Sequence, residues 1–335
     1  MAIRTREIWH SDDRYTAYRI PGMTITSRGT ILICCEARDT WSDWARMDIL
    51  LYRSEDGGET FTGPVVMARG TADSPTADNP VCIAGPDGAL HFLYCRDYSL
   101  TGAVLYRRSD DDGVTWSEPL NVFDATRPEL HNVFALGPGH GIALEDGTLL
   151  VPVWTVLKSS GAERDSHHPA VVSTFYSADN GASWHLGELI PPTPDCPDPN
   201  ETAAAQAPDG SVFFSVRLGG PTGCRAVTRS RNGYSGFEPL TLCPTLVDPV
   251  CMGSVVRAED ALLSVNCAST TDRVNLVVRA SLDGGRTWPK SLTVEPGDAG
   301  YADIAYRDGT VYVLYEQRGG ERDMLARFPL SDILG

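Results

Sequence analysis

One eight-residue pattern, Ser-x-Asp-x-Gly-x-Thr/Ser-aromatic, recurs along the chain and constrains its fold more than any other feature. Four copies are clear, and a fifth, decayed copy occupies 230–237; the clear copies occupy 54–61, 109–116, 177–184 and 281–288. Each follows a strand-like run such as DILLYR or VNLVVRA. The Asp and Gly suit a tight turn, and the terminal aromatic can pack beneath it. The repeats therefore predict an array of similar β units.

A second repeat, of hairpin turns, counts these units. The turns are centred on Gly29, Gly88, Gly147, Gly210 and Gly309, with a degenerate copy at Ala261. Their mean spacing of 56 residues divides the 335-residue chain into about six units, each with room for about four strands. We therefore predict an all-β fold, a single six-bladed β-propeller of four-stranded antiparallel blades spanning residues 1–335. A β-helix needs much shorter repeats, and two β-sandwiches would not produce six phased turns.

The turn phasing also predicts which residues share one end of the propeller. If each turn joins the two inner strands of a blade, residues about eight to ten before it and about seven after it lie at the opposite end. The residues at these offsets are Arg19, Glu36, Asn79, Cys95, Trp154, Glu201, Arg217, Tyr301 and Glu316. A solvated polar mouth is one interpretation. However, Arg217 and Glu316 sit within apolar strands, where an unpaired charge is costly, which favours an anion-binding or catalytic site.

The charge balance excludes several classes of partner. The chain has 28 Lys and Arg against 44 Asp and Glu, a formal net charge of −16. Nucleic acid and anionic membrane surfaces require a basic face, so neither is expected as a partner. Because no apolar run approaches the length of a membrane span, we expect no membrane insertion.

Cysteine and histidine usage gives weaker indications. The nine cysteines form no CxxC pair, which favours buried thiols in a reducing compartment. The start of the chain shows no signal peptide, so we expect a cytoplasmic protein, although a secreted form without its signal would look the same. His167 and His168 lack partners at metal-ligand spacing, which favours a solvated loop over a zinc site.

Several motifs resemble those of a known family. The tetrad Tyr-Arg-Ile-Pro at 18–21, the repeated aspartate boxes and the segment at 137–154 resemble sialidases (exo-α-neuraminidases) of the six-bladed propeller type. The resemblance extends from Arg19 to Glu316, nearly the whole chain. It implies an exo-glycosidase that removes a terminal sialic acid or a related ulosonic acid from a small molecule or a glycan.

The resemblance also implies substrate-binding residues. In that family three arginines clamp the substrate carboxylate, and Arg19, Arg217 and Arg273 match them. The glutamate that holds the first arginine matches Glu316, and an arginine beside the acid loop matches Arg38. Arginine suits this task because its planar guanidinium group can pair with a carboxylate through two hydrogen bonds.

The implied catalytic residues are Asp43 as acid and base, Tyr301 as nucleophile and Glu201 as its partner. A neutral tyrosine avoids the repulsion that a carboxylate nucleophile would meet beside the substrate carboxylate. It needs a nearby base, because its ordinary pKa is about 10. Asp43 would protonate the leaving oxygen and then activate water, so we expect its pKa to be raised. This two-step route implies retention of configuration and requires no metal or organic cofactor.

Three questions stay open on the sequence alone. Trp41 and Trp44, beside Asp43, suit either stacking or a core. N-acetylneuraminic acid is the default sugar, while deaminated sialic acid (KDN) and an eight-carbon 3-deoxy-octulosonic acid are alternatives. A catalytically inactive carbohydrate-binding propeller is the alternative function, although it would have no use for the complete catalytic set. A purely structural scaffold would not explain arginines in buried strands at Arg217 and Arg273.

Overall fold

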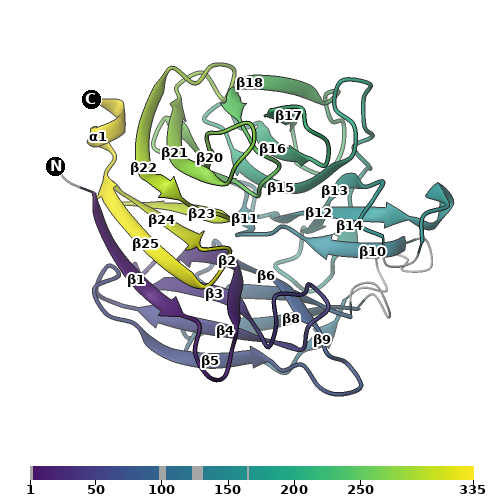
Figure 1. Ribbon diagram of the computed structural model, residues 1–335, viewed down its shortest axis with the longest axis vertical. Helices are drawn as coiled ribbons and strands as arrows, with labels where there is room; N and C mark the ends of the chain where they lie inside the picture. Colours follow the sequence, from purple (N-terminus) through teal and green to yellow (C-terminus); the bar gives the residue numbers. More distant parts are fainter. Residues whose placement is uncertain (1–2, 98–102, 123–130, 164–165) are drawn as a thin grey trace.

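The strands form a ring of sheets around a common central axis (Figure 1). The computed structural model describes residues 3–97, 103–122, 131–163 and 166–335, and within these ranges the strands assemble into six antiparallel sheets. The predicted all-β, six-bladed β-propeller is confirmed. No helix among the described residues is long and apolar enough to cross a membrane.

The first three blades follow one another along the chain. The first comprises β2 (Ala17–Ile25), β3 (Ile31–Arg38), β4 (Met47–Ser54) and β5 (Thr62–Ala68). The second comprises β6 (Ala77–Ala84), β7 (Leu90–Arg96), β8 (Ala103–Ser109) and β9 (Leu120–Asn121). The third comprises β10 (His131–Leu136), β11 (Ile142–Ala143), β12 (Leu149–Leu157), β13 (Val171–Ser177) and β14 (His185–Leu186). It has an extra strand because its inner strand is interrupted, and both β10 and β11 pair with β12.

The N-terminal strand completes the last blade and so closes the ring. The fourth blade comprises β15 (Pro199–Gln206), β16 (Val212–Leu218), β17 (Cys224–Ser230) and β18 (Thr241–Val247). The fifth comprises β19 (Ser254–Ala258), β20 (Ala261–Cys267), β21 (Val274–Ser281) and β22 (Lys290–Asp298). The sixth comprises β23 (Ala302–Arg307), β24 (Thr310–Gln317), β25 (Arg322–Pro329) and β1 (Arg4–His10). Strand β1 pairs with β25, where purple meets yellow in Figure 1. The short helices are η3 (Lys158–Ser160) and α1 (Ser331–Leu334).

The phased turns join the two inner strands of each blade, as the spacing predicts. Gly29 and Gly210, for example, connect β2 to β3 and β15 to β16. Their φ angles of 89° and 83° lie in the left-handed region that favours glycine. A Cβ atom at either position would meet no other atom within 4 Å, so the backbone conformation, rather than lack of space, calls for glycine.

The aspartate boxes are hydrogen-bonded turns between the third and fourth strands of a blade. In the third blade, Ser177 Oγ accepts from Gly181 N at 2.8 Å, and the Asp179 carboxylate accepts from Ser183 N at 2.8 Å and from its hydroxyl at 2.6 Å. The side-chain and backbone bonds from Ser183 lower the pKa of Asp179 to about 2. Trp184, at the end of the box, stacks on Phe175 at 5.3 Å between ring centroids. These boxes are therefore structural elements.

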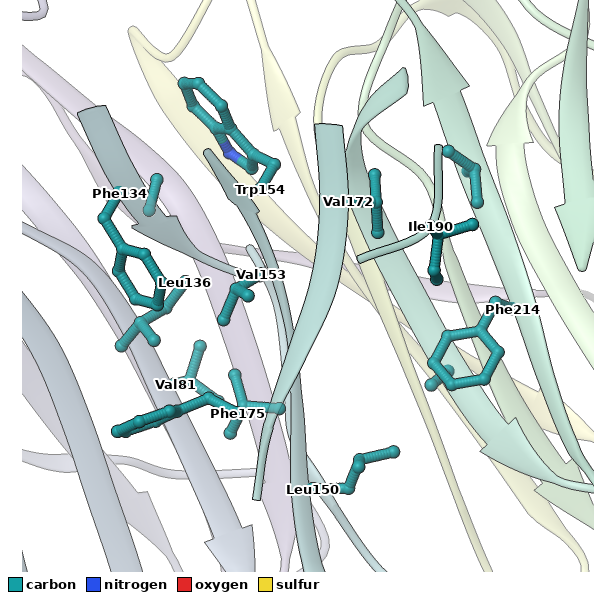
Figure 2. Close-up of a cluster of buried hydrophobic side chains, with 14 of the residues drawn as sticks. Val81, Phe134, Leu136, Leu150, Val153, Trp154, Val172, Phe175, Ile190 and Phe214 are labelled. Carbon is teal, nitrogen blue, oxygen red and sulfur yellow. The ribbon is translucent and has the colours of Figure 1, made fainter. Parts of the chain in front are cut away.

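Apolar side chains fill the space between neighbouring blades. Figure 2 shows one such cluster, in which Val81 of the second blade, Phe134 and Phe175 of the third and Phe214 of the fourth contribute to a continuous core. All four are at most 1% exposed. The blades therefore hold together mainly by burial of apolar surface between sheets.

One buried carboxylate links several blades at the channel axis. Asp303 on β23 accepts hydrogen bonds from Met23 N of the first blade at 2.8 Å and from Ser254 Oγ of the fifth at 2.7 Å. It also contacts His140 Nδ1 at 2.7 Å, in the segment that interrupts the inner strand of the third blade. That segment approaches the first blade so closely that a Cβ on Gly22 would lie 2.8 Å from Gly139 O. The segment therefore connects the third blade to the first and sixth blades near the axis.

The pair of His140 and Asp303 predicts a pH-dependent stability. Burial alone would lower the pKa of His140, but the Asp303 carboxylate raises it above its ordinary value of 6.5. The pair therefore stabilises the fold fully below about pH 6.5, and this contribution is lost as pH rises through the raised pKa of His140. The loss in free energy of unfolding is about 1.4 kcal/mol for each pH unit by which the folded pKa exceeds the unfolded one. In urea unfolding at a series of pH values, the stability advantage of the wild type over His140→Gln should shrink with rising pH. A constant difference would contradict the pairing.

Candidate active site

A cavity of about 220 Å³ opens at the mouth of the channel opposite the hairpin turns. Its lining includes seven of the eight site residues expected from the sequence: Arg19, Arg38, Asp43, Glu201, Arg217, Arg273 and Tyr301. The eighth, Glu316, lies behind Arg19 and bonds to it. Glu36, Asn79 and Trp154 also line the cavity, as the turn phasing predicts.

Bulges in the inner strands aim backbone and side chains into the cavity. In β2 the register shifts between Arg19 and Gly22, and Ile20 takes a φ of 58°; β6 repeats this shift, with Asn79 at 50°. Each bulge releases an N–H group that a glutamate accepts. Ile20 N donates to Glu316 at 2.9 Å, and Asn79 N donates to Glu36 at 2.7 Å. Bulges are a common means of redirecting side chains at a site.

Tyr301, Glu201 and Arg217 form a close hydrogen-bonded group on one wall of the cavity. The Tyr301 hydroxyl donates to Glu201 Oε1 at 2.5 Å, and Arg217 Nη1 donates to the same hydroxyl at 2.8 Å. Arg217 also bonds to the other oxygen of Glu201. Burial raises the pKa of Tyr301, opposed by the charge of Arg217, while the charge of Glu201 raises it further. The phenol is therefore neutral in the free site, with a carboxylate placed to receive its proton.

Three guanidinium groups surround the Tyr301 ring. Their Cζ atoms lie 5.0 Å (Arg19), 6.0 Å (Arg217) and 5.2 Å (Arg273) from the ring centroid. Arg19 is held by Glu316 at 2.8 Å. Arg273 differs from the sequence expectation, because it is an exposed residue in the bend before β21 and is not part of a buried strand. The three side chains nevertheless converge, and such a group of fixed cations suits a carboxylate ligand.

Asp43 lies in the loop between β3 and β4, and its ionisation differs from our expectation. Its side chain is 53% exposed and accepts from Arg38 Nη1 at 2.6 Å. Burial raises the pKa of Asp43, but the charge and hydrogen bond of Arg38 outweigh it, so the pKa is lowered overall. The predicted raised pKa is therefore wrong for the free site. Arg38 itself is positioned by Glu36, which accepts from its Nε at 2.9 Å.

Besides Ile20 of the Tyr-Arg-Ile-Pro tetrad, four residues that the sequence did not predict at the site line the cavity: Asp78, His167, His168 and Asn200. Asp78 is 2% exposed, and burial together with the charge of Glu36 raises its pKa well above the ordinary value, which favours the neutral acid. Asp78 lies ten residues before its turn glycine, as Arg19 does, so the offset of Arg19 applied to the second blade points to Asp78. The histidine pair lies in a loop, as expected, and His168 is exposed. Both histidines also line the cavity, which was not expected, and His168 contacts Asp198 at 2.5 Å.

The chain is similar in sequence and in structure to known sialidases. Residues 46–313 match the family model described as a BNR repeat-like domain. A sialidase from Micromonospora viridifaciens is 30% identical over 91% of this chain and 50% of its own length. A sialidase from Bacteroides fragilis is 28% identical over 91% of this chain and 61% of its own length. The solved structure named Hadza microbial sialidase Hz136 superposes with a TM-score of 0.83 at 27% identity, covering 96% of this chain and 67% of that one.

The chain belongs to the BNR repeat-like family within the sialidase superfamily, which confirms the resemblance seen in its motifs. It spans about half to three fifths of the length of the two curated relatives above.

The ion pair of Arg38 and Asp43 gives a prediction for the site. Replacing Arg38 by Gln removes the charge that most lowers the pKa of Asp43, while the effect of burial remains, so that pKa should rise in the variant. The measurement is a titration of ¹³C-labelled aspartate carboxyl groups by NMR, with the Asp43 signal assigned by Asp43→Asn. An unchanged or lower pKa in the variant would show that Arg38 does not govern this carboxylate.

Proposed function

We propose that this chain is a retaining exo-sialidase that releases a terminal sialic acid from glycoconjugates through a tyrosine nucleophile. One observation carries the proposal. The Tyr301 hydroxyl is hydrogen-bonded to Glu201 at 2.5 Å, and the Tyr301 ring lies among three guanidinium groups that line the cavity. A sialic acid bears its carboxylate on the anomeric carbon, so a clamp on that carboxylate places the reacting carbon beside the phenol.

The first step of the proposed reaction forms a covalent intermediate. Tyr301 Oη bonds to the anomeric carbon and passes its proton to Glu201, while the glycosidic carbon–oxygen bond breaks. The leaving oxygen takes a proton from Asp43. The free site favours ionised Asp43, and the arriving substrate carboxylate adds a negative charge nearby that raises its pKa toward the protonated form.

The second step releases the sugar with retained configuration. Asp43, now ionised, takes a proton from water, and the resulting oxygen attacks the anomeric carbon from the side that the leaving group occupied. The Tyr301 oxygen departs and recovers its proton from Glu201. Arg217 donates to both Tyr301 and Glu201 and can stabilise the negative charge as it moves between them.

The substrate carboxylate would bind between Arg19, Arg217 and Arg273. Arg19 and Arg217 are already fixed by Glu316 and Glu201, so little side-chain freedom is lost when they bind an anion. N-acetylneuraminic acid remains the default sugar of the proposal. A carbohydrate-binding propeller without catalysis would need the clamp but not a tyrosine bonded to a carboxylate.

The test is hydrolysis of a 4-methylumbelliferyl α-sialoside by the wild type and by Tyr301→Phe. The substitution removes only the nucleophilic oxygen, so we expect kcat to fall by at least about 10³-fold with the fold intact. Arg286→Ala, a change at an exposed arginine in the aspartate box at 281–288, at the end of the propeller away from the cavity, serves as the control with normal turnover.

Near-normal turnover by Tyr301→Phe would remove this residue from the mechanism. Absence of turnover by the folded wild type on a panel of ulosonosides would contradict the enzyme function and favour a binding propeller.

A further inference from the structure

Two exposed indole rings flank the proposed acid. Trp41 and Trp44 are 51% and 40% exposed. Across the part of the chain that the structure describes, every other Trp, Tyr or Phe residue is buried or half-buried. The core alternative for these two residues is therefore wrong. Neither lines the cavity, so they stand outside the pocket proposed for the sialic acid ring.

The loop that carries the two indoles is closed at its base. Asp39 N donates to Arg46 O at 3.0 Å, and the side chains of these two residues form an ion pair at 3.1 Å. Arg46 also contacts the buried Asp48 at 3.2 Å and donates to Gly70 O at 3.1 Å. Thr16 Oγ1 donates to Asp39 O at 2.7 Å from the neighbouring strand connection. The tip of the loop, residues 40–45, is thus presented from an anchored stem.

An aromatic wall connects this loop to the cavity. The Trp44 ring lies 5.7 Å from the His167 ring, which in turn lies 5.6 Å from the Trp154 ring. His167 and Trp154 both line the cavity, whereas Trp44 stands beyond it. The wall therefore continues from inside the pocket to the surface around Asp43, where a group attached to the bound sugar would emerge.

We propose that Trp41 and Trp44 form a subsite for the leaving group, and that its ligand is a hexopyranose linked to the sialic acid. This inference rests on the proposed function. Asp43 must reach the glycosidic oxygen to protonate it, so the first ring of the leaving group lies next to the neighbours of Asp43 in the loop. Indole faces are negative and sugar C–H groups are positively polarised, so the apolar face of a pyranose packs well on tryptophan.

The subsite would raise the rate only for substrates that carry such a ring. Binding energy from a part of the substrate that does not react can be used to position the reacting bond. Tryptophan provides a large contact surface with few rotatable bonds, and the anchored loop stem reduces the entropy lost on binding. A methyl aglycone is too small to cover either ring and should gain nothing from them.

The experiment compares kcat/KM for 3′-sialyllactose with kcat/KM for methyl α-sialoside in the wild type, Trp41→Ala, Trp44→Ala and Trp44→Phe. We expect the ratio of the two values to fall about tenfold in each alanine variant and to be largely restored by Trp44→Phe. Leu282→Ala is the matched control, because Leu282 is also an exposed apolar residue, with 58% of its surface exposed. It follows the C-terminal end of β21, whereas Arg273 of the site precedes the N-terminal end of the same strand. Its ratio should equal that of the wild type.

Inhibition by the 2,3-didehydro-2-deoxy analogue of sialic acid, which has no leaving group, completes the test. Its Ki should stay within about twofold of the wild type in all variants. If Ki rises and both substrates lose rate equally, the indoles shape the sialic acid pocket and the subsite is wrong. Tryptophan variants that behave like Leu282→Ala would also overturn it. A wild-type protein that hydrolyses neither sialoside would contradict the proposed function itself, and with it this subsite.

Discussion

The buried carboxylate of Asp303 is the interaction on which the geometry of the site most depends. It lies two residues beyond Tyr301 and accepts hydrogen bonds from the first and fifth blades, with His140 of the third blade against it. A carboxylate buried this completely is costly unless each oxygen is paired, and here both are. The strand that follows the tyrosine is therefore fixed at the axis where several blades meet. Directional hydrogen bonds from a fixed carboxylate set the spacing of the inner strands more strictly than apolar packing does.

The site arises from equivalent positions of a repeated hairpin that carry different residues. Glu36 and Glu316 lie seven residues after their turn glycines, and each accepts the N–H group released by the bulge of the following blade. At the same position in the fourth blade stands Arg217, which bonds to Glu201 on the neighbouring strand. The repeated hairpin thus provides the same backbone position in each blade. Because different blades carry a glutamate or an arginine at that position, the side chains at the mouth form a cluster without sixfold symmetry. This explains how a chain with a net charge of −16 gathers cations at one mouth.

Turn spacing predicted the blades and the shared mouth, because both depend on position along regular strands. It also placed Arg19, Glu201, Arg217, Tyr301 and Glu316 at that mouth. Arg38, Asp43 and Arg273 came from motif resemblance alone, and they too line the cavity. Features that depend on contacts between loops were not predictable in this way. The pKa of Asp43 is lowered because Arg38 folds against it, a contact that spacing does not reveal. His167 reaches the cavity through an irregular segment after β12, so no strand phase applied to it. Arg273 was expected in a strand, although it belongs to the bend before one.

The central claim is that Tyr301 attacks the anomeric carbon. The most direct measurement is covalent trapping with a 2,3-difluoro sialic acid, whose fluorine at C3 slows breakdown of the intermediate, followed by mass spectrometry of proteolytic peptides. The account predicts one sugar added per chain, attached to the peptide that contains Tyr301, and no adduct in Tyr301→Phe. An adduct on Glu201 or Asp43, or rapid turnover with an inverted first product and no adduct, would contradict it.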